Sequence, residues 1–113
     1  MSTPNELYDE AEKLKAENKL EEVVAKLEEA LQIDPSYSLA HSSLAVTLQK
    51  MGKHEEAIAH AEKTCELEPD DPFSFAAMSV IYQRAYAGTG DMKFIPMAEE
   101  AMEKSRILQS QRQ

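Results

Sequence analysis

The sequence predicts an all-α fold built from repeated helix pairs, and three observations support that prediction. Glycine is scarce, tryptophan is absent, and alanine, glutamate, leucine and lysine dominate the composition. The segment LQIDP at residues 31–35 returns in pattern as CELEP at residues 65–69, which is a period of 34 residues. Proline stands at the first helical position after Thr3 and after Asp71. Together these features predict one domain, residues 1–113, with about six antiparallel helices.

The first unit, about residues 4–35, is interpreted as two helices. Thr3 and Glu6 form a capping-box pattern that starts the first helix. A turn is expected at Asn18-Lys19. The second helix carries apolar residues at helical spacing and ends before Pro35, because the residue before a proline is pushed out of the helical region.

The second unit, about residues 38–69, repeats this plan with a turn at Gly52-Lys53 and a closing proline. The third unit, about residues 72–110, departs from the period in its middle. Nine residues separate Leu48 from Ala57, but sixteen separate the matching pair, Tyr82 and Ala98. We therefore expect an inserted loop at residues 87–95 between the two helices of this unit.

The spacing of large and small residues resembles the tetratricopeptide repeat family. The small residues of that motif allow helices to approach closely. The resemblance implies an α-α superhelix, a right-handed solenoid whose first helices line a concave surface that binds peptides or helices. The matching residues are Leu7, Ala11, Leu14, Val23, Leu27, Ala30 and Pro35 in repeat one; His41, Leu44, Ala45, Leu48, Ala57, Ala61, Thr64 and Pro69 in repeat two; and Phe75, Met78, Ser79 and Tyr82 in repeat three.

The resemblance also implies a groove, in which each repeat contributes one residue to each row. Leu39, Val46, Phe73 and Val80 form an apolar strip suited to an amphipathic helix or an extended peptide. The alternative is that Leu39 and Phe73 pack between neighbouring first helices. The residues expected to line the groove are Tyr8, Glu12, Leu39, Ser42, Val46, Gln49, Lys50, Phe73, Ala76, Val80, Gln83 and Arg84.

Two cations, Lys50 and Arg84, stand at one edge of this strip. They are expected either to receive an acidic group of a ligand or to complement helix dipoles. A well-known branch of the family grips the C-terminal carboxylates of heat-shock chaperones with lysines, asparagines and an arginine. At the matching positions this chain has Tyr8, Glu12, Ser43, Phe73 and Ala77. Binding of that kind is therefore not expected.

The segment YAGTGDMKFIP at residues 86–96 has the look of a phosphate-binding loop. It lacks the Gly-x-x-x-x-Gly-Lys-Ser/Thr spacing and a preceding strand, so its glycines are interpreted as a way out of the helix. The apolar residues Met92, Phe94 and Ile95 are expected to fold back over the last helix pair, or else to project as a hook that binds a partner. Glu99 and Arg106 make the last helix polar where a further repeat would pack, as in a capping element.

No catalytic residue, metal site or cofactor is expected. His54 and His60 lie six residues apart, which turns them away from each other on a helix and differs from the His-Glu-x-x-His zinc pattern. Cys65 is expected to be a buried, inert thiol. The net charge of −9 disfavours nucleic acid, and no apolar run approaches the roughly 18–20 residues of a membrane span.

The expected function is that of a non-enzymatic, cytoplasmic adaptor or scaffold that binds a peptide or helix of a partner protein. The cytoplasmic assignment rests on the single cysteine and on the lack of a signal-peptide pattern at the N-terminus. A monomer is expected. The alternative is a self-associating scaffold, because Met92, Met97 and Met102 cluster in the third repeat. The polar Glu99/Arg106 face counts against end-to-end stacking.

Overall fold

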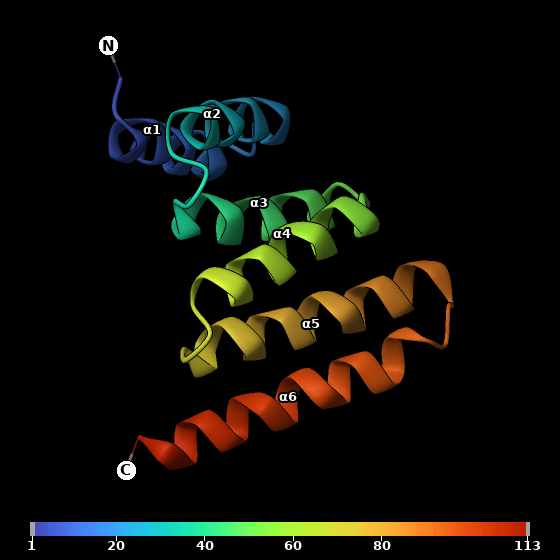
Figure 1. Ribbon diagram of the computed structural model, residues 1–113. Helices are drawn as coiled ribbons and strands as arrows, with labels where there is room; N and C mark the ends of the chain where they lie inside the picture. The colour runs from blue at the N-terminus through green and yellow to red at the C-terminus, as the bar shows by residue number, and fades with distance from the viewer. Residues whose placement is uncertain (1, 113) are drawn as a thin grey trace.

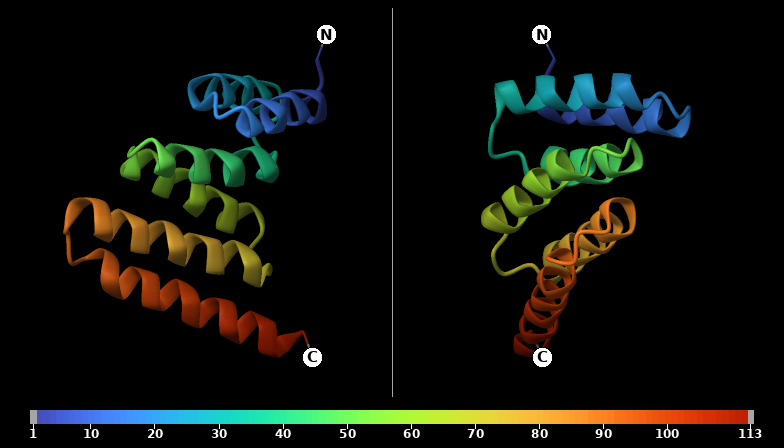
Figure 2. Two further views of the ribbon diagram at one scale, coloured as in Figure 1. Left: turned by 180° about the vertical axis from the view of Figure 1, so that it is seen from behind. Right: turned by 90° about the vertical axis from the view of Figure 1, so that its right-hand side faces the viewer.

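The computed structural model describes residues 2–112, and within them the chain forms helices joined by short turns (Figure 1). Successive helices pair side by side, and the pairs stack in chain order so that the two termini lie at opposite ends (Figure 1). Figure 2 shows each pair turned relative to the one before it. The predicted all-α repeat fold is confirmed. The six helices of the described residues are α1 (Pro4–Ala16), α2 (Leu20–Ile33), α3 (Ser38–Lys50), α4 (His54–Leu67), α5 (Pro72–Thr89) and α6 (Phe94–Gln111).

The helix boundaries follow from local sequence signals. At the start of α1 the Thr3 hydroxyl accepts a hydrogen bond from the Glu6 amide at 3.2 Å, and the Glu6 carboxylate accepts one from the Thr3 amide at 3.2 Å. The Asp71 carboxylate caps α5 by accepting from the Phe73 amide at 3.0 Å. The turns before α2 and α4 place Asn18 (φ 60°) and Gly52 (φ 78°) in the left-handed region, which asparagine and glycine tolerate best.

The core consists of alanines at helix–helix contacts, with larger side chains between them. Leu7, Leu27 and Leu44 are almost completely buried, and each such leucine contributes roughly 1.5–3 kcal/mol. Because each pair packs mainly on its neighbours, stability builds up along the stack. The buried alanines are Ala11, Ala30, Ala40, Ala45, Ala57, Ala61, Ala85, Ala98 and Ala101.

The structure corrects the expected loop at residues 87–95 of the third repeat. Helix α5 has 18 residues where α3 has 13, so it continues through residues 87–89. Helix α6 already begins at Phe94, and the connection shrinks to residues 90–93. A longer helix lets the backbone N–H and C=O groups of residues 87–89 form hydrogen bonds within α5. The extension also carries Ala85, which is buried in the same apolar cluster as Phe94.

The two glycines of this segment have different roles. Gly90 adopts φ 72° and ends α5, as expected. Gly88 instead lies inside the helix, where a Cβ atom would overlap the Nε2 atom of His54. The interpretation of both glycines as a way out of the helix was therefore wrong for Gly88, which makes room for a side chain of α4.

The apolar residues of the same segment differ in their exposure to solvent. Phe94 is 6% exposed, and its ring stacks on Tyr82 with centroids 6.3 Å apart and an interplanar angle of 18°. Met92 is 70% exposed, and Ile95 is partly exposed. Phe94 thus folds back onto the α5–α6 pair, whereas Met92 and Ile95 do not.

A histidine pair joins α3 to α4. The Nδ1 atoms of His41 and His60 lie 3.0 Å apart, and His41 Nε2 lies 3.0 Å from the Pro35 carbonyl. Because a carbonyl can only accept, His41 carries its hydrogen on Nε2, and its Nδ1 accepts from His60. The sequence had suggested no partner for His60. Burial and the neighbouring His41 lower the pKa of His60, while Glu56 opposes them.

We predict that Phe94→Ala destabilises the protein by roughly 3–5 kcal/mol, because it removes a buried ring and leaves a cavity. The free energy of unfolding in urea measures this loss. Met92→Ala is the matched control, since Met92 is exposed, and its effect should stay within about 0.5 kcal/mol. Similar small effects in both variants would show that Phe94 does not hold the α5–α6 pair together.

We also predict that stability falls as the pH is lowered through the range just below 6.5. The folded state holds His60 neutral with a lowered pKa, so the unfolded chain takes up the proton first. Urea unfolding at a series of pH values measures the slope. His60→Gln should flatten this part of the profile and leave the carboxylate-dependent loss at lower pH in place. An unchanged profile would contradict the assignment.

Candidate functional site

The surface between α3 and α5 is the candidate site. The two helices contact each other directly, and a hollow of about 410 Å³ opens between them. The sequence predicted five of its residues. It missed Ala77 and Ile81, although the repeat period places them one step after Ser43 and Thr47. The lining residues are Val46, Gln49, Lys50, Ala77, Val80, Ile81 and Arg84.

The apolar strip is open to solvent. Leu39 is 51% exposed and Phe73 is 67% exposed, so neither packs between neighbouring first helices. Val46 and Val80 are also partly exposed, and they face the hollow from its two sides. Leu39 and Val46 form one row along α3, and Phe73 and Val80 form a second row along α5.

The cations Lys50 and Arg84 both line the hollow. Within residues 2–112 neither makes an ion pair at 4.0 Å or less. Lys50 ends α3 and complements its dipole, but α5 continues for five residues beyond Arg84. Since dipole effects fade within the last turn, they do not explain Arg84.

Repeat one contacts α3 through a polar side chain. Lys15 Nζ donates to the Glu12 carboxylate at 3.0 Å and to the Ser43 hydroxyl at 2.8 Å. Tyr8 packs edge-on against Tyr37, with ring centroids 6.1 Å apart. Burial, followed by the charge of Glu12, raises the pKa of Tyr8. Glu12 and Ser43 are therefore both engaged with Lys15.

Three other predicted residues lie near the groove or beyond it. Ser42 lines a small hollow of about 20 Å³ that adjoins the main one through Val46 and Ala77. Ala76 is half-buried on α5. Gln83 donates to the Ser79 hydroxyl at 3.2 Å and lines a different hollow, between α5 and α6. The structure thus separates Gln83 from the groove.

Cys65 is buried, and its sulfur lies 3.8 Å from that of Met78. Burial, with a smaller effect of Asp71, raises the pKa of the thiol to about 11, which disfavours the reactive thiolate. From residue 2 to residue 112, no three histidine, cysteine or acidic side chains gather as metal ligands. Over the same range, no helix combines the length and the apolar character needed to cross a bilayer.

Comparisons with known proteins agree with this architecture. The profile described as tetratricopeptide repeat matches residues 14–79, more than half of the chain. The fold is similar to that of MamA (TM-score 0.83, 19% identity, 97% of this chain and 60% of that one). It is also similar to the Sgt2 TPR domain from Aspergillus fumigatus (TM-score 0.77, 22% identity, 95% of this chain and 66% of that one). A chain of the CopN–Scc3 complex is similar as well (TM-score 0.77, 17% identity, 93% of this chain and 58% of that one).

The chain spans less than two thirds of the length of each of these structures, and at such identities the likeness shows the fold alone. No curated protein sequence matches it. The family match runs from the end of α1 through α2, α3 and α4 into the first part of α5. The chain therefore belongs to the tetratricopeptide repeat family.

Proposed function

We propose that the chain is a non-enzymatic interaction module that binds an apolar segment of a partner protein between α3 and α5. The observation that carries the proposal is the hollow of about 410 Å³ that the exposed Val46 and Val80 line. Exposed Leu39 and Phe73 lie seven residues before them on the same two helices. Scattered apolar residues are common on protein surfaces, but exposed apolar residues that gather at a hollow are typical of a binding site.

The spacing of the strip suits a helix or an extended peptide. Leu39 and Val46 are seven residues apart on α3, and Phe73 and Val80 are seven apart on α5. Seven residues correspond to about 10 Å along a helix. A ligand lying between the two rows meets apolar side chains on both sides at two levels. A partner helix with anchors at i, i+3 or i+4, and i+7 fits this arrangement.

The charges favour one orientation of the ligand. Lys50 and Arg84 concentrate positive charge at one end of the groove, although the whole chain carries a net charge of −9. An acidic group at one end of the bound segment meets these cations, while the remainder of the partner is neutral or basic. A reducing, cytoplasmic setting suits the free thiol of Cys65.

We predict that Phe73→Glu/Val80→Glu abolishes partner binding while the protein stays folded, because both side chains are exposed. Pull-down from native lysate with quantitative mass spectrometry identifies partners that the wild type retains and this variant loses. Ile33→Glu, an exposed apolar residue outside the groove, is the matched control. Full binding by the folded double variant would contradict the groove proposal. Loss of binding in Met92→Glu instead would place the contact on the α5–α6 connection.

We predict that Lys50→Glu/Arg84→Glu weakens the same partner at least tenfold, since hydrogen bonds to charged groups contribute about 1.5–3 kcal/mol and 1.4 kcal/mol is a factor of ten. Isothermal titration at two salt concentrations measures the effect, and the wild type should lose more affinity in salt than the variant. Lys53→Glu/Lys63→Glu changes the net charge equally away from the groove and serves as control. Equal weakening by both pairs would mean that overall charge, and no local contact, is responsible.

A further inference from the structure

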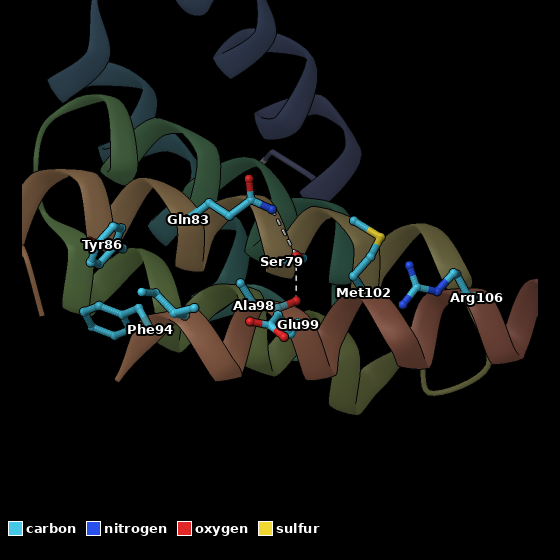
Figure 3. Close-up of a pocket in the computed structure, with 9 residues that line it drawn as sticks. Ser79, Gln83, Tyr86, Phe94, Ala98, Glu99, Met102 and Arg106 are labelled. Atoms are coloured by element: carbon cyan, nitrogen blue, oxygen red, sulfur yellow. Dashed lines mark hydrogen bonds between the residues drawn. The ribbon is translucent and has the colours of Figure 1, made fainter. Parts of the chain in front are cut away.

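The outer face of the third repeat holds a second hollow, of about 520 Å³, between α5 and α6. Figure 3 shows Tyr86 and Phe94 near one end of it, Arg106 near the other, and Glu99 between them. Its lining shares no residue with the α3–α5 groove. The hollow is therefore a separate surface.

Within the stack, this is the face by which one repeat contacts the next. The residues at the matching positions of α2 and α4 are Val24, Leu31, Ile58 and Cys65, which are buried or half-buried at repeat contacts. In α6 the same positions hold Glu99 and Arg106, and both are exposed. Charges have replaced the apolar residues that join one repeat to another, so a partner of this face must match charge as well as shape.

The two charges have opposite sign and lie on one side of α6. Seven residues, or about 10 Å of helix, separate them. We place a two-fold axis perpendicular to α6, midway between Glu99 and Arg106 and beside Met102. Rotation about this axis exchanges the positions of Glu99 and Arg106. A second α6 placed antiparallel about this axis brings Glu99 of each copy opposite Arg106 of the other, so the same attraction forms twice.

We infer that this face binds a second copy of the chain in that two-fold arrangement. A parallel copy would place like charges together. A head-to-tail copy would use the α1–α2 end, where Glu10 is paired with Lys26 at 3.1 Å, and would extend without closing. The expectation that Glu99 and Arg106 oppose stacking thus applies to head-to-tail contact and not to two-fold contact.

The apolar residues of the face suit the same arrangement. Met102 is half-buried and lies beside the axis, where its flexible thioether adapts to the facing helix. Tyr86 and Ile95 are partly exposed at one end of the hollow. Arg106 also pairs with Glu103 on its own helix at 2.6 Å, but both side chains are more than half exposed, and such pairs contribute little. Arg106 is therefore available to a second copy.

The experiment exploits the reciprocity of the contact. Light scattering over a concentration series should show the wild type rising from 12.7 kDa towards twice that mass. Glu99→Arg alone and Arg106→Glu alone should each raise the dissociation constant at least tenfold, because like charges then face each other in both pairs. An equimolar mixture of the two variants should form a heterodimer, and Glu99→Arg/Arg106→Glu should dimerise again.

Controls separate this surface from folding and from the groove. Glu100→Arg changes the same charge on a different side of α6 and should dimerise like the wild type. Circular dichroism melting verifies that each variant is folded. Phe73→Glu/Val80→Glu should also dimerise normally, so the groove and this face can fail independently. A wild type that stays monomeric at all concentrations, single variants that dimerise unchanged, or a monomeric mixture would each overturn the inference.

Discussion

Close contact between helices at alanine positions is the constraint on which the rest of the structure depends. Ala40, Ala45, Ala57 and Ala61 are buried, and they let α3 and α4 pack tightly on each other and on their neighbours. This spacing brings α3 and α5 into direct contact. The hollow between Val46 and Val80 lies along this contact. Larger residues at the alanine positions would spread the stack and open the groove.

The parts of the fold that the sequence predicted are those set by local interactions. A cap such as Thr3 with Glu6 involves residues three apart, so it can be identified without a tertiary structure. The groove was predictable to the same extent, because a repeating sequence places equivalent residues at equivalent sites. Val46 and Val80, and Lys50 and Arg84, are such pairs, and each pair lines one hollow.

The parts that could not be predicted depend on contacts between distant residues. Glycine and threonine at residues 88–90 have low helix propensity, which indicated a loop, yet α5 continues to Thr89 because Ala85 and Gly88 pack against Phe94 and His54. The His41–His60 contact joins two helices that no sequence pattern pairs at those positions. Gln83 was assigned to the groove from the repeat period alone. The matching Gln49 lines the hollow between α3 and the first helix of the next repeat, whereas in the described residues α5 is followed only by α6, so Gln83 lines the hollow between those two helices.

Helix α5 separates two open surfaces, and each residue of its middle turns faces either the core or one of these two surfaces. Ile81, Tyr82 and Ala85 are buried in the core. Val80 and Arg84 line the hollow towards α3, while Ser79, Gln83 and Tyr86 line the hollow towards α6. Every exposed residue from 79 to 86 thus lines one of the two hollows. A substitution at any of them alters either the surface towards α3 or the surface towards α6, so this stretch has no exposed position that is remote from both.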